Sequence, residues 1–185
     1  APLSCHYLFL PLPDTTWEAV FAVGPYLTAP LSQQDILECA ERFGVQPSDY
    51  KAIEIGRVNP GAVICAETSC YLQGLIDIEP DIFTIATRRT DRQGMNMPFE
   101  TRRHYFADSC FDDHIVTVET EYGTYRMYDL ERSVCDCIRF REEIQPAIYE
   151  KIILNHKKLR EEAMVKRMLA YAKAMKFEKK MREDI

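Results

Sequence analysis

The chain has 185 residues, 46% of them hydrophobic and 28% charged, and its formal net charge is −6. These values are typical of a globular protein with one substantial core. No apolar run approaches the ~18–20 residues of a membrane span, and the chain does not open with the basic and apolar segments of a secretory signal. We therefore expect neither a membrane protein nor a secreted one.

Cysteine usage favours a cytoplasmic protein. The seven cysteines are an odd number and lack the spacing of a disulfide framework, which indicates reduced thiols. Cys135 and Cys137 form a C-x-C pair whose side chains diverge by about 200° on a helix, so a zinc site there needs ligands from elsewhere in the chain. We expect no metal and no cofactor, and we interpret Cys65, Cys70 and Cys137 as small core hydrophobes.

The first 57 residues are expected to form a small unit of a hairpin and helices. Two apolar runs, 5–10 and 17–23, are separated by turn residues and predict paired strands. A helix is predicted from Ser32 to Gly44, and a second one starts at Pro47 and runs to about Ile55.

A helix-turn-helix is the alternative interpretation of residues 33–56. Ala40 and Gly44 have the spacing of its first helix and turn. The second helix, however, offers both acidic and basic side chains and makes a poor surface for a DNA groove. We therefore favour a helical pair that packs on the hairpin.

Residues 58–185 are expected to form an α+β domain after a boundary turn at 56–60. A mostly antiparallel sheet is covered by helices and followed by a C-terminal helical bundle. The predicted strands are 82–87, 102–106, 115–120 and 124–128. The predicted helices are 61–73, 130–141, 146–156, 160–175 and a short basic helix that closes the chain.

The stretch 124–143 is the point around which this domain is organised. Tyr125 and Met127 alternate with polar neighbours, as in a half-buried strand. Asp129 is a good helix N-cap, and the residues that follow form one apolar helix face, made of Val134, Cys137 and Ile138. A strand that runs directly into a capped helix fixes the angle between the sheet and a helical layer.

The same stretch carries a family resemblance. RMYDLERSVCDCIRFREEI (126–144) resembles the Y-x-x-E-[RK]-[ST]-[LV]-x-D-x-[LI]-R signature of the AbiEi family. The matching positions are Tyr128, Glu131, Arg132, Ser133, Val134, Asp136, Ile138 and Arg139. GAVICAETSCYLQGL (61–75), with Glu67, is similar to an upstream family helix, and MLAYAKAMKFEKKMR (168–182) is similar to the family's closing segment.

The resemblance implies a function. The family contains antitoxins and transcriptional repressors of bacterial type IV toxin–antitoxin systems, which are abortive-infection systems. Its members are not enzymes. They counteract a nucleotidyltransferase-type toxin, and their C-terminal domain carries antitoxin activity and assists operator binding. The winged helix that usually precedes this domain is not evident in residues 1–57.

Residues 1–52 carry a separate resemblance, to the N-terminal sensing region of AraC-type transcriptional regulators. It rests on an extended "PLP…GPY" hairpin followed by a helix that ends in "FGV". The alternative function is therefore a ligand-sensing regulatory module. Its aromatic residues are Tyr7, Phe9, Trp17, Phe21 and Tyr26, a stripe that is more often core than pocket.

No residue pattern favours an enzyme. The histidines, which are His6, His104, His114 and His156, stand in no nucleophile or metal motif, and there is no phosphate-binding or dinucleotide-binding glycine loop. Asp112, Asp113 and His114 are interpreted as loop residues rather than an acid–base cluster. Glu67 is either a buried polar anchor or, as is commoner for such a residue, part of a solvated helix face.

Basic side chains remain as candidates for nucleic-acid contacts. Residues 151–185 carry 11 basic and 5 acidic side chains, although the whole chain is acidic. The candidates are Arg88, Arg89, Arg92, Arg102, Arg103, Lys173, Lys176, Lys179 and Lys180. A solvated face is the commoner role for such residues, so we expect at most weak, non-specific binding. The sequence predicts no oligomeric state.

Overall fold

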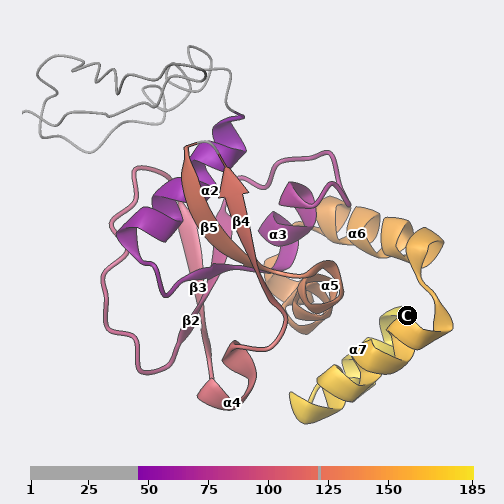
Figure 1. Cartoon of the computed structure of the whole chain (residues 1–185). Helices are drawn as coiled ribbons and strands as arrows, with labels where there is room; N and C mark the ends of the chain where they lie inside the picture. The colour runs from indigo at the N-terminus through magenta and orange to yellow at the C-terminus, as the bar shows by residue number, and fades with distance from the viewer. Residues whose placement is uncertain (1–45, 121) are drawn as a thin grey trace, which may run out of the picture.

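The computed structural model describes residues 46–120 and 122–185 (Figure 1). The strands are β1 (Val63–Ile64), β2 (Phe83–Arg88), β3 (Thr101–Phe106), β4 (Ile115–Thr120) and β5 (Gly123–Tyr128). The helices are α2 (Pro47–Val58), α3 (Ala66–Leu72), α4 (Asp108–Phe111), α5 (Leu130–Arg139), α6 (Pro146–Leu159), α7 (Glu162–Ala174) and α8 (Glu178–Asp184), with a 3₁₀ turn, η1, at Arg141–Glu143.

The fold is α+β, and its five strands form one sheet in the order β3-β2-β1-β5-β4. The sheet is mixed. β1 pairs antiparallel with β2, and β4 pairs antiparallel with β5, whereas β2 and β3 run parallel, as do β1 and β5. The prediction of a mostly antiparallel sheet is therefore wrong in this respect.

The long connection 89–100 explains the parallel pair. Two strands that run in the same direction need a crossover of about a dozen residues, because the chain must return to the starting edge before the second strand begins. The segment 89–100 crosses back in this way from the end of β2 to the start of β3, and Phe83 lies beside Thr101 in the register. The sequence pattern locates both strands but carries no information on their relative direction.

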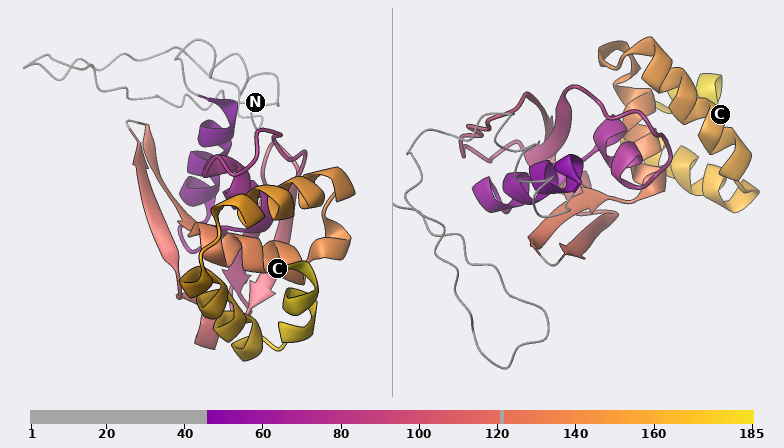
Figure 2. Two further views of the ribbon diagram at one scale, coloured as in Figure 1. Left: turned by 90° about the vertical axis from the view of Figure 1, so that its right-hand side faces the viewer. Right: turned by 90° about the horizontal axis from the view of Figure 1, so that it is seen from above.

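The sheet separates two hydrophobic cores, because successive side chains of a strand point to opposite faces. On one face, Ile64, Ile85 and Met127 pack with Ala52 and Ile55 of α2. On the other face, the helical layer of α3, α5, α6, α7 and α8 covers the sheet. Figure 1 shows α2 on one side of the strands and α3 and α5 on the other, and Figure 2 shows α6 to α8 beyond them.

The predicted alternation in 124–128 is confirmed. Tyr125 and Met127 face α2, whereas Tyr128 faces the helical layer. The strand is paired on both sides, with β1 and with β4. Ile138, like its neighbours on the predicted apolar face of α5, is fully buried, and the Asp129 side chain caps α5 by accepting a hydrogen bond from the Arg132 N–H at 2.8 Å.

The helix predicted at 61–73 begins later than expected. Val63 and Ile64 form the short central strand β1 instead, and Cys65 is the N-cap of α3. An apolar run of this length gives no periodicity that separates a short strand from the first turn of a helix. The other strands and helices predicted within the described residues occur within a few residues of their expected bounds.

α2 packs closely on β5. Gly56 lies so near to this strand that a Cβ atom would stand 2.8 Å from the backbone oxygen of Thr124. The hairpin and the helix predicted from Ser32 to Gly44 lie outside the described residues. No helix in the ranges 46–120 and 122–185 combines the length and the apolar character needed to cross a bilayer.

Candidate functional site

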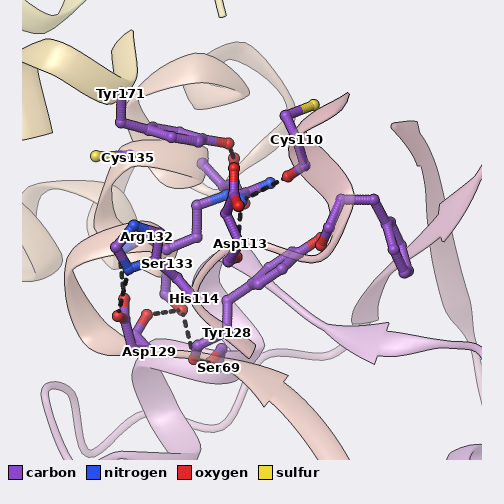
Figure 3. A network of polar contacts seen from close by, with 12 residues as sticks. Ser69, Cys110, Asp113, His114, Tyr128, Asp129, Arg132, Ser133, Cys135 and Tyr171 are labelled. Carbon is purple, nitrogen blue, oxygen red and sulfur yellow. Dashed lines mark hydrogen bonds and ion pairs between the residues drawn. The ribbon is translucent and has the colours of Figure 1, made fainter. Parts of the chain in front are cut away.

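A buried arginine lies at the centre of the family-like motif. The Arg132 Nε–H donates to Asp136 Oδ2 at 3.1 Å, and both side chains are fully buried. Nη1 of Arg132 donates to the backbone oxygens of Cys110, at 2.9 Å, and Asp113, at 3.1 Å. The Tyr171 hydroxyl donates to Asp136 Oδ1 at 3.3 Å. Figure 3 shows that Tyr171 of α7 and Cys110 reach this arginine from opposite sides.

Aromatic rings enclose the guanidinium. Its carbon lies 4.0 Å from the ring centroid of Tyr128, 4.3 Å from that of Tyr171 and 5.3 Å from that of Phe106. Rings at these distances attract a cation through their quadrupole. Arg132 therefore connects α5 to β5, to α7 and to the end of β3, and three parts of the chain that are remote in sequence meet at one side chain.

Burial and charge pairing act in opposite directions on the pKa values of this cluster. Burial raises the pKa of Asp136 above its ordinary value, although Arg132 and Arg139 act in the opposite direction. Burial also opposes the charge on Arg132, but the attraction of Asp136 and of the two tyrosines outweighs it and keeps the pKa of this arginine raised. Nη2 of Arg132 and Nη1 of Arg139 have no hydrogen-bond partner in the described chain. The core thus holds two guanidiniums close to one carboxylate.

The carbonyl group of Tyr128 ties the sheet to the helices. Its oxygen accepts hydrogen bonds from the hydroxyl of Ser69, at 2.9 Å, from the hydroxyl of Ser133, at 3.2 Å, and from the side chain of Gln73, at 3.1 Å. The Tyr128 hydroxyl in turn donates to the Phe111 oxygen at 2.8 Å. The first and second motif segments are therefore joined through one strand end.

Two further motif residues lie nearer the surface. Glu131 accepts hydrogen bonds from Arg167 of α7, and this ion pair links α5 to α7. Arg139 makes no ion pair within the described chain, and its guanidinium lies 5.1 Å from the Phe106 ring and 5.0 Å from the Phe140 ring. Neither residue presents a free charged group beside a cavity of substrate size.

Glu67 is buried, so the commoner interpretation of a solvated position is wrong for this residue. Its Oε1 accepts from the Thr84 hydroxyl at 2.7 Å and from Arg102 Nη1 at 3.2 Å. Oε2 has no partner in the described chain. Burial raises the pKa of this carboxyl group above the ordinary value. Glu67 links α3 to β2 and β3 and does not reach the Arg132 cluster.

Most arginines of the strand–loop–strand unit are already paired. Arg88 donates to Asp112 at 2.6 Å and to Asp108 at 3.1 Å, and Arg103 lies 2.7 Å from Asp91. Arg102 is held by Glu67. The exposed members without an ion pair in the described ranges are Arg89 and Arg92. The free positive charge of this unit is therefore concentrated in the turn after β2.

The C-terminal lysines are mostly free. Lys173, Lys176 and Lys179 are exposed, and no carboxylate of the described chain pairs with them. Lys180 is only half-exposed and lies 2.9 Å from Glu142. The basic residues of α7 and α8 thus remain candidates for weak contacts with phosphates.

Three side chains of the cluster were not identified as site residues from the sequence. Tyr171 had a signal, because it belongs to the third motif segment. Phe106 and Cys110 had none. Phe106 contributes a ring face and Cys110 a backbone oxygen, and neither kind of contact gives a recognisable pattern in the sequence. Asp112, Asp113 and His114 have structural roles: Asp112 binds Arg88, the Asp113 oxygen binds Arg132, and His114 Nδ1 lies 2.8 Å from Asp129.

The described cysteines are buried and free of disulfides. Cys70 and Cys137 lie in van der Waals contact, with their sulfurs 3.8 Å apart, as expected of small core residues. No group of three or more histidine, cysteine, aspartate or glutamate side chains in residues 46–120 and 122–185 is arranged to hold a metal ion.

Buried histidines predict a loss of stability in mild acid. His156 is 1% exposed, and its Nε2 has no partner in the described chain. Burial, helped by Arg160, lowers its pKa below 6.5. The unfolded chain therefore binds a proton that the native protein resists, and stability falls as the pH falls below about 6.5. Burial acts in the same direction on His104, which stacks on Phe140.

We expect the melting temperature to decrease between pH 7 and pH 5, and His156→Gln to flatten this decrease. The double change with His104→Gln should flatten it further. Thermal unfolding followed by circular dichroism at half-unit pH steps measures the slope for each protein. Equal slopes in the native chain and in both variants would contradict the assignment.

Comparison with known proteins gives no family for this chain. No protein-family model matches it, and a search of curated proteins finds no significant match. The class that the molecule itself defines is an α+β domain with a mixed five-stranded sheet and a buried arginine cluster at the junction of sheet and helices.

Proposed function

We propose that this chain is a non-enzymatic, antitoxin-like transcriptional regulator, which counteracts a nucleotidyltransferase-type toxin and assists operator binding. The proposal starts from the resemblance of three ordered segments, 61–75, 126–144 and 168–182, to the AbiEi family. Each segment alone is a weak signal. The proposal therefore also requires the three segments to pack together in the folded domain.

The observation that carries the proposal is the convergence of these segments. α3 packs against α5, and α5 packs against α7 and α8. Ser69 from the first segment binds the Tyr128 oxygen, and Tyr171 from the third binds Asp136. These contacts show that the three segments form one packed unit. Such a unit is what the proposal requires of a domain similar to that of the family.

The position of the motif residues defines their role in the proposal. Three of the motif residues, Tyr128, Arg132 and Asp136, are buried. Their side chains form hydrogen bonds within the domain, so they stabilise the fold and are not exposed to a partner. Partner contacts fall to the exposed surface of the helical layer. The proposal therefore separates two groups of changes: those in the cluster act through folding, and those on the surface act through recognition.

A growth assay tests the proposal. The chain is co-expressed with a nucleotidyltransferase-type toxin that arrests growth when it is expressed alone, and we expect growth to be restored. Arg57→Gln, an exposed change on α2 and therefore on the opposite face of the sheet from the helical layer, serves as a control and should rescue equally well. Continued arrest, with the protein folded and abundant by immunoblot, would reject antitoxin activity.

Nucleic-acid binding by this chain is predicted to be weak, non-specific and carried by the C-terminal helices. Counterion release gives a slope of about −0.9 in log K against log salt for each phosphate neutralised. Replacing Lys173, Lys176, Lys179 and Lys180 with glutamine should flatten this slope without unfolding the protein. Lys180 should contribute least, because Glu142 already binds it.

Fluorescence anisotropy on two unrelated duplexes over a range of salt concentrations measures this effect. Arg57→Gln is the control, since this exposed arginine is paired with Glu54 on the same helix. Sub-micromolar binding to one duplex alone, insensitive to the four lysine changes, would point to a DNA-reading element elsewhere.

The ligand-sensing alternative depends on residues 1–52, of which 1–45 lie outside the described part of the chain. It predicts that antitoxin activity is absent and that the growth assay gives no rescue. The same experiment therefore distinguishes the two functions.

A further inference from the structure

A groove opens where the central strand of the sheet ends early. β1 has only two residues, whereas its neighbours β2 and β5 have six each. Val63 lies opposite Ala86, so continuing the register by two residues brings Gly61 opposite Arg88 at the end of β2. The turn Asn59–Gly61 occupies this place instead of a strand. β2 and β5 are therefore not bridged by a strand here.

The resulting groove has a volume of about 460 Å³, within the range of ~300–1,000 Å³ that is usual for small-molecule sites. It is lined by the turn before β1, by the end of β2 and the turn that follows it, by the end of α4 and by the middle of β5. The polar residues of the lining include Asn59, Arg88, Thr90, Asp91, Asp112 and Arg126.

The acceptors of the groove are already bonded. Asp91 receives hydrogen bonds from the Asn59 side chain, at 2.8 Å, and from the backbone N–H of Gln93, and it lies 2.7 Å from Arg103. Asp112 is bound by both of its oxygens to Arg88. These pairs neutralise the carboxylates and fix Arg88 against the ring of Phe111, 4.7 Å away.

The donors, in contrast, have remaining capacity. Arg126 makes one weak contact, 3.4 Å from the Pro60 oxygen, and no ion pair in the described chain. The Thr90 hydroxyl is exposed and has no hydrogen bond there. Arg89 and Arg92, which flank the lining residues Thr90 and Asp91 in the sequence, are exposed and positively charged. The free donors of the groove, with these charges in the adjoining turn, thus favour an anion.

Charge selects the kind of anion. The groove and the residues next to it carry five arginines (Arg88, Arg89, Arg92, Arg103 and Arg126) and three aspartates (Asp91, Asp108 and Asp112), all three of them paired with Arg88 or Arg103, which leaves a net excess of two positive charges. A single carboxylate neutralises one of them, whereas a phosphate monoester or a diphosphate neutralises both. Guanidinium and hydroxyl donors are also the groups that bind phosphate oxygens in proteins.

We propose that this groove binds the phosphate group of a small phosphorylated molecule, with Arg126 and Thr90 as direct contacts and the exposed Arg89 and Arg92 of the adjoining turn as additional positive charges. The already paired Arg88 closes one wall and keeps its orientation through Asp112 and Phe111. This inference goes beyond the proposed function and does not depend on it. A growth assay without rescue would not affect the phosphate-binding proposal. Absence of phosphate binding would not affect the proposed antitoxin activity.

Isothermal titration of the full chain with inorganic pyrophosphate tests the site. We expect saturable binding, a loss of affinity of about tenfold or more in Arg126→Gln, from one charge-assisted contact, and a smaller loss in Thr90→Val. Arg182→Gln is the matched control, because this exposed arginine is paired with Glu178 on α8, remote from the groove. It should bind pyrophosphate as the native chain does.

Competition experiments identify the source of the phosphate. A nucleoside diphosphate that displaces pyrophosphate, with the same dependence on Arg126, supports a small-molecule site. Displacement by a short duplex but not by the nucleotide would overturn that part of the proposal. Absence of saturable binding, or an equal loss in Arg126→Gln and Arg182→Gln with unchanged melting temperatures, would overturn the site itself.

Discussion

Replacing Asp136 with leucine should destabilise the protein by about 3–5 kcal/mol, because the change leaves the guanidinium of Arg132 buried without a counter-ion. Both partners of this pair are fully buried, and the Tyr171 hydroxyl loses its acceptor in the same step. Urea unfolding followed by circular dichroism gives the free energy of unfolding. A cost below 1 kcal/mol would show that water reaches the pair.

The double variant Arg132→Met/Asp136→Leu isolates the role of charge. Well-packed apolar residues often replace a buried ion pair without loss of stability. Here the recovery should be incomplete, since the backbone oxygens of Cys110 and Asp113 lose their donor. The surface pair Glu131–Arg167 provides the control. Arg167→Met should cost no more than about 1 kcal/mol, because exposed ion pairs contribute little.

Phe106→Ala should cost about 3–5 kcal/mol, the usual range for a buried phenylalanine. This ring is 1% exposed, and it packs edge-on against Tyr128 and Phe140. It also lies beneath two guanidiniums, those of Arg132 and Arg139. Chemical unfolding is again the measurement, with the midpoint and the slope reported separately.

Phe106→Leu distinguishes the filling of space from the attraction of the ring for cations. Leucine keeps much of the volume but has no quadrupole, so we expect an intermediate cost of about 1–2 kcal/mol. Tyr105→Ala is the control on the same strand. Its side chain is 51% exposed, and the change should stay within about 0.5 kcal/mol. Equal costs at the two positions would contradict the packing described here.

The buried Arg132 cluster and the exposed binding surfaces are expected to have separate roles. The buried cluster sets the stability of the domain, and its disruption should abolish every activity at once. Changes at the groove and on the C-terminal lysines should alter binding alone. A variant that loses pyrophosphate binding but still rescues growth would show that the two activities are independent.

The sequence by itself determined the local elements of residues 58–185. The alternation of Tyr125 and Met127, the Asp129 cap and the apolar face with Val134 and Ile138 depend on neighbours within a turn or a strand, so periodicity and capping chemistry are enough to predict them. The same holds for the four longer strands. The spacing of Arg132 and Asp136, four apart on a helix, is equally visible in the sequence.

Only the tertiary structure decided which of these groups are buried and what they bind. β1 is too short for a periodic signal, and the direction of β3 depends on the path of the connection before it. Glu67 becomes a buried anchor because Thr84 and Arg102, far along the chain, supply its donors. Arg126 remains free because no described carboxylate comes near it. Desolvation and pairing are set by neighbours remote in sequence, and folding alone brings those neighbours together.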